Sequence, residues 1–168
     1  MSAEGTRSAR RLTGWRAAAV WLVALSGIAA IVLGQIVDPV PAILLVILVS
    51  VIGAFGFVGA LLVIRLPANP IGWLLWITGT GLGWAIAGVA YGTGSVATCG
   101  GCLPATAPIA LTANTAFAPM LGAVAVFLPL LFPDGRLPSP RWRPVAWLGA
   151  VAIVLFTASL AFSPSPIT

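Results

Sequence analysis

The sequence contains no histidine and no lysine, and its acidic residues are limited to Glu4, Asp38 and Asp134. The absence of histidine excludes histidine acid–base chemistry, histidine metal ligands and a phosphoacceptor histidine. The absence of lysine excludes a lysine that reaches a nucleotide phosphate. So few acids argue against paired carboxylates, and no set of residues combines a nucleophile with its base. The sequence therefore predicts a chain that is not an enzyme and uses no cofactor or metal.

Charge of either sign is scarce. Charged residues make up 7% of the 168 positions, against about 25% in a typical soluble domain. Hydrophobic residues make up 60%, and the mean hydropathy is +1.12. This composition excludes an ordinary soluble domain. It predicts an all-α, polytopic transmembrane helix bundle that forms one membrane domain.

Five apolar runs are long enough to cross a bilayer, which takes about 20 helical residues. We expect spans at about 17–37, 42–64, 71–91, 114–132 and 145–162, between a basic tail at 1–16 and a short tail at 163–168. A secretory signal peptide would also explain the first run, but its apolar core is usually about 7–15 residues long. We therefore favour a retained first helix.

The connections between the runs carry turn and helix-start residues. Two prolines follow Asp38 closely and end the first helix. Asn69 is a good helix N-cap and Pro70 suits the first helical position, so a third helix should begin there. The longest loop is expected at 92–113, which is uncharged and rich in small residues.

The basic residues are all arginine, and each lies beside an apolar run rather than within one. They are Arg7, Arg10, Arg11, Arg16, Arg65, Arg136, Arg141 and Arg143. With five spans and the N-terminus inside, all of them face the cytoplasm, as the positive-inside rule requires. The C-terminus then lies outside, and the chain is a multi-pass protein of the cell membrane. The same distribution argues against nucleic-acid binding, which needs a basic patch or stripe.

Cys99 and Cys102 lie in the expected outer loop. They suit a redox switch, a small structural disulfide in an oxidising compartment, or two free thiols in a mobile loop. A metal site is excluded because it needs about four ligands and no histidine or nearby carboxylate completes the set. We favour the external disulfide or the free thiols over the redox switch.

No expected span contains aspartate, glutamate, lysine, arginine or histidine. Ion pumps, proton-coupled carriers and voltage sensors usually need such a group, so the sequence argues against a transporter subunit. The spans do carry small residues four apart. These ridges are Ser26, Ala30 and Gly34; Gly56 and Ala60; and Gly79, Gly83 and Ala87. We interpret them as packing surfaces within the chain rather than as a dimer face.

Two connections on the arginine side carry recognisable motifs. Residues 69–73 read NPIGW, and residues 132–138 read FPDGRLP, followed by RWRPVAW at 141–147. We call residues 65–70 the first hinge and residues 132–143 the second hinge. Together the motifs resemble the membrane regions of actinobacterial sensor histidine kinases, over roughly residues 45–165. The resemblance implies a membrane-embedded sensor, or input, region of two-component signal transduction.

The chain departs from such kinases in one respect. They continue with a further span and then a cytoplasmic part that dimerises through a histidine-bearing helix pair and binds ATP. The chain contains neither and has no phosphoacceptor histidine. We expect it to be a truncated product or fragment of a kinase, a stand-alone paralogue of the sensor part, or a misassigned reading frame.

On this resemblance the candidate signalling residues are Asn69, Pro70, Asp134, Gly135 and Arg136. The alternative interpretation is that they only cap helices, make turns and set orientation. The expected partners are the lipid bilayer and either a second copy of the chain or a separate membrane protein or kinase. The alternative function is a small non-catalytic membrane scaffold or partner subunit.

Overall fold

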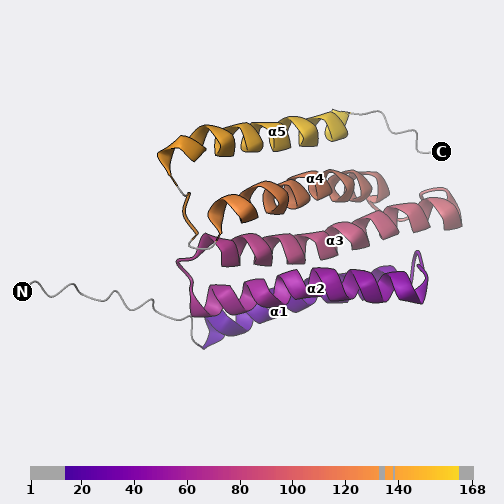
Figure 1. Cartoon of the computed structure of the whole chain (residues 1–168). Helices are drawn as coiled ribbons and strands as arrows, with labels where there is room; N and C mark the ends of the chain where they lie inside the picture. Colours follow the sequence, from indigo (N-terminus) through magenta and orange to yellow (C-terminus); the bar gives the residue numbers. More distant parts are fainter. Residues whose placement is uncertain (1–13, 133–134, 138, 163–168) are drawn as a thin grey trace, which may run out of the picture.

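The computed structural model describes residues 14–132, 135–137 and 139–162. These residues form five α-helices and one short 3₁₀ helix, with no strand among them (Figure 1). The helices are α1 (Trp15–Gly34), α2 (Ala42–Arg65), α3 (Pro70–Cys99), α4 (Thr106–Leu131) and α5 (Arg143–Phe162), and the 3₁₀ helix η1 (Pro140–Trp142) directly precedes α5. Each of the five is long and apolar enough to cross a membrane. The predicted all-α polytopic bundle is therefore confirmed.

The long loop predicted at 92–113 is wrong. Helix α3 continues to Cys99 and α4 already begins at Thr106, so a short turn joins them. The small residues that suggested a loop instead allow close helix packing, because Gly92 lies against the side chain of Ala110. Pro108 falls in the first turn of α4, where proline is tolerated. The expected spans 71–91 and 114–132 thus lie inside longer helices.

Helix α3 is the centre of the bundle, with α1, α2 and α4 packed against it. Glycines on α3 allow each close approach. Gly79 lies against the backbone of Gly56 in α2, and Gly83 lies against the backbone of Gly27 in α1. The interpretation of the Gly79 and Gly83 ridge as packing within the chain is confirmed, although its two glycines face different helices.

The buried side chains concentrate between α1, α2 and α3. One cluster contains Val20, Ala24, Ala60 and Val63, and a second contains Ile31, Ile52 and Leu82. The indole nitrogen of Trp76 donates a hydrogen bond of 3.1 Å to the carbonyl of Val20, which further joins α3 to α1. These three helices form the core of the molecule.

Helices α4 and α5 form an arm on one side of this core (Figure 1). In α4 only Ala113 and Ala118 are buried, and in α5 no residue is. Helix α5 packs against α4, where Gly122 meets Ile153 and Gly149 meets Val126. The arm is therefore held to the core mainly through α4.

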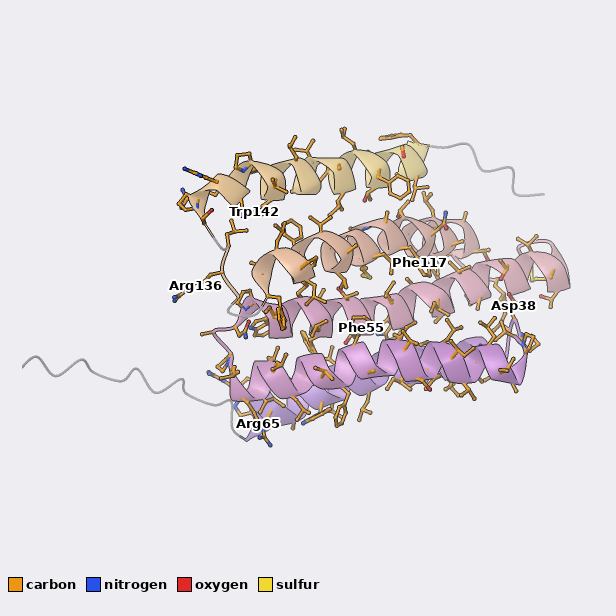
Figure 2. All side chains as sticks on the ribbon, in the orientation of Figure 1. Asp38, Phe55, Arg65, Phe117, Arg136 and Trp142 are labelled. Atoms are coloured by element: carbon orange, nitrogen blue, oxygen red, sulfur yellow. A yellow bond between two sulfur atoms is a disulfide. The ribbon has the colours of Figure 1, made fainter. Side chains whose placement is uncertain are left out.

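The two ends of the bundle differ in charge. Arg65 and Arg136 lie at one end, and Asp38 lies at the other (Figure 2). At the Asp38 end, the hydroxyl of Thr93 donates a hydrogen bond of 2.6 Å to the carboxylate and ties the α1–α2 turn to α3. The described arginines thus share one end, which is the arrangement that the predicted orientation requires. The orientation itself stays a prediction.

Candidate functional site

The first hinge leads into α3 through a capped helix start. The Asn69 side-chain oxygen accepts a hydrogen bond of 3.0 Å from the backbone nitrogen of Ile71, and Pro70 occupies the first helical position. The predicted cap is therefore present. The indole nitrogen of Trp73 also donates to the carbonyl of Pro67, at 2.9 Å. One bond thus joins a hinge side chain to the backbone of α3, and the other joins a side chain of α3 to the hinge backbone.

The second hinge turns back onto the first. Gly135 has a φ of +70°, and its nitrogen donates a hydrogen bond of 2.7 Å to the carbonyl of Leu131 at the end of α4. A β-carbon on Gly135 would lie 2.7 Å from the Pro70 Cδ and 2.8 Å from the Asn69 side-chain oxygen. Only glycine combines this backbone with this approach. Three of the predicted hinge residues are therefore in one contact, which we call the hinge contact.

Arg136 and Asp134 are the remaining two predicted hinge residues. Arg136 is exposed and lines a cavity of about 400 Å³ together with Ser139 and Arg143. Asp134 lies outside the described residues. The two hinge motifs identified these positions, but no pattern in the sequence indicated that the two hinges meet.

Cys99 and Cys102 are joined in a disulfide, which is one of the alternatives that the sequence left open. It closes the turn after α3, where Gly100 adopts a left-handed φ of +67°. The Tyr91 hydroxyl donates a hydrogen bond of 2.9 Å to the carbonyl of Pro104, so the turn is also tied to the body of α3. A disulfide within the turn and a hydrogen bond from α3 thus constrain this end of the α3–α4 hairpin, whereas the hinge end is held by packing.

A groove of about 760 Å³ runs between α1, α3 and α4, and no pattern in the sequence indicates it. Small residues line much of it, including Ser26, Ala30 and Gly34 from the predicted ridge of the first span. The Trp84 indole nitrogen donates a hydrogen bond of 3.2 Å to the Ser26 hydroxyl across one wall. That ridge therefore packs only in part and leaves space between α1 and α4.

The described residues offer little reactive chemistry. They contain no group of three or more histidine, cysteine or acidic side chains that could hold a metal ion. What they do offer is a contact between the two hinges, an open cavity beside it lined by two arginine residues, and an apolar groove. These features suit binding and conformational change.

No protein-family model, curated protein or solved structure matches the chain. The resemblance to sensor histidine kinases therefore stays a prediction that rests on the two hinge motifs.

Proposed function

We propose that the chain is the membrane-embedded input region of a sensor histidine kinase or a closely similar signalling protein of the cell membrane. It carries no catalytic centre of its own. The observation that carries the proposal is the hinge contact, where Gly135 packs against Asn69 and Pro70. It joins the end of the arm to the start of the central helix, on the side where we expect the cytoplasm.

The arm is the element that would move. Helix α4 contains Pro119 and Pro129, and each proline removes one backbone hydrogen bond and favours a bend. The groove separates much of α4 from α1, so α1 does not obstruct a shift of α4 along α3, against which α4 packs closely. Small helix shifts at packed interfaces are a common way to pass a signal across a membrane protein.

The hinge contact would convert such a shift into a change at the cytoplasmic surface. The end of α4 cannot move toward α3 without a collision between Gly135 and Pro70, because no free space separates them. It can move away only by breaking the contact. A displacement of the arm therefore changes the position of the second hinge relative to the first, and this change is the proposed output.

The test begins with the natural gene product in membrane vesicles supplied with ATP. We expect its mass and peptide map to include a kinase part, or a kinase to co-purify with it, and we expect acid-labile phosphohistidine to form. The variant Gly135→Ala should change the rate of phosphorylation. The control Gly100→Ala has the same backbone strain at the opposite end, with nothing within 4 Å of the new β-carbon, and should not change it.

Two results would overturn the proposal. One is a product without a kinase part that also recruits no kinase. The other is equal phosphorylation by Gly135→Ala, Gly100→Ala and the unchanged protein, since the hinge contact would then pass no signal.

A non-catalytic scaffold or partner subunit is the second candidate, and α5 is the observation that favours it. None of its residues is buried, and Trp147, Leu148 and Phe162 are each more than two-thirds exposed. This face would pack against another membrane protein or a second copy of the chain. A gene product without kinase activity that co-purifies with a membrane partner would favour this function.

A further inference from the structure

The cavity at the second hinge lies beside the start of α5. Besides Arg136, Ser139 and Arg143, it is lined by Leu131, Gly135, Leu137 and Pro140. It is an open depression of about 400 Å³ at the surface rather than an enclosed pocket. Its lining combines two arginine residues with apolar ones.

The charge of this end of the molecule favours an anion. Arg65 and Arg136 lie at one end of the bundle, while Asp38, the one acidic residue that the structure describes, lies at the opposite end (Figure 2). Arg16 lies in the first turn of α1, Arg141 lies in η1 and Arg143 begins α5. The whole sequence contains eight arginines and only three acidic residues. A guanidinium group binds phosphate through two parallel hydrogen bonds, so paired arginines are well suited to a phosphate group.

The surroundings of the cavity favour a lipid over a soluble anion. Trp142 is 46% exposed and Trp147 is 73% exposed, and both lie within a few residues of Arg143. Tryptophan gathers at the level of the lipid headgroups. Beyond the cavity, α5 exposes Leu148, Val151 and other apolar side chains along its length. A molecule with an anionic head and hydrocarbon tails therefore matches both the cavity and the face next to it.

We propose that this cavity binds the phosphate headgroup of an anionic phospholipid from the surrounding leaflet, with Arg136 and Arg143 as its ligands. The acyl chains lie along the exposed face of α5. Basic pockets beside transmembrane helices on the cytoplasmic side are known to hold anionic headgroups. The proposal does not rest on the signalling function, because it needs only a membrane and the cavity.

The test uses the purified full chain in detergent, with phosphatidylglycerol or phosphatidylcholine added and bound lipid counted by native mass spectrometry. We expect one preferred phosphatidylglycerol site. The double variant Arg136→Gln/Arg143→Gln should weaken it roughly 100-fold, because each charge-assisted hydrogen bond contributes about tenfold or more. The variant Arg136→Lys/Arg143→Lys keeps the charge but loses the planar fork, and should weaken it by about tenfold.

The matched control is Arg16→Gln/Arg65→Gln, which removes the same charge away from the cavity. In about 0.5 M salt, the long-range electrostatic attraction between the arginines and the anionic lipid is largely screened. The control variant should therefore lose less than about fivefold in affinity for phosphatidylglycerol. The proposal is overturned if the control variant loses as much affinity for phosphatidylglycerol as the cavity variant, or if the cavity variant binds this lipid as tightly as the unchanged protein does. It is also overturned if phosphatidylcholine binds as tightly as phosphatidylglycerol. Soluble glycerol phosphate that binds as tightly as the lipid would also overturn it, because the occupant would then be a free anion.

Discussion

The hinge contact makes a quantitative prediction at Gly135. Substitution by alanine forces a non-glycine residue into a left-handed φ of +70°, which costs about 1–2 kcal/mol. The new β-carbon also lies 2.7 Å from the Pro70 Cδ, and such overpacking costs about 1–3 kcal/mol. The free energy of unfolding should therefore fall by about 2–5 kcal/mol.

Gly100→Ala separates these two contributions. Gly100 has a φ of +67°, almost the same as that of Gly135, but a β-carbon there would have no neighbour within 4 Å. This variant should lose only the backbone contribution, about 1–2 kcal/mol. The measurement is reversible unfolding in mixed micelles as the fraction of denaturing detergent rises, followed by circular dichroism and tryptophan fluorescence.

A double-variant cycle then identifies the neighbour. Pro70→Ala removes the ring atoms that face Gly135, so it should relieve part of the cost of Gly135→Ala. Residues in contact typically show coupling energies of about 0.5–3 kcal/mol. If Gly135→Ala and Gly100→Ala cost the same and the cycle shows no coupling, the two hinges are not in contact and the proposed output has no structural basis.

Two further predictions concern packing and orientation. Gly79→Ala should lower the free energy of unfolding by about 1–3 kcal/mol, because its β-carbon would collide with the backbone nitrogen and Cα of Gly56. Gly56→Ala places its β-carbon in open space and should cost nothing or stabilise by up to about 1 kcal/mol. The same micelle titration measures both variants, and equal losses would contradict the contact between α2 and α3. After reduction of the disulfide, a membrane-impermeant maleimide added to intact cells should label Cys102. The same reagent should not label Arg65→Cys in a protein that lacks the native cysteines. The reverse labelling pattern would show that the orientation is inverted.

The sequence was sufficient for the class of fold because charge and apolar length are strong constraints in a membrane. Hydrocarbon tolerates few ionised groups, so the positions of the arginines mark the helix ends. Asn69 and Pro70 predicted the start of α3 correctly, because a cap and a first-turn proline act locally. These features depend on neighbours in sequence and need no knowledge of tertiary packing.

The features that the sequence did not reveal depend on distant neighbours. Gly92 and its small neighbours indicated a loop, yet α3 continues through them because Ala110 packs there. The approach of Gly135 to Asn69 joins residues far apart in the chain, and no local pattern encodes such a pair. The groove is a space between three helices and likewise has no local signal.

Gly135 belongs to both proposals, and this shared residue links them thermodynamically. It packs against Pro70 in the hinge contact, and it lines the cavity that Arg136 and Arg143 make cationic. A lipid that binds one arrangement of the hinge more tightly than another shifts the equilibrium toward the arrangement that it prefers. Conversely, a change in the hinge equilibrium alters the apparent affinity for the lipid. If Gly135→Ala shifts the hinge toward one arrangement, phosphatidylglycerol affinity should change by at most the ratio of the lipid's affinities for the two arrangements. Equal affinity in the variant and the unchanged protein would leave the lipid site intact but show that it is not coupled to the hinge contact.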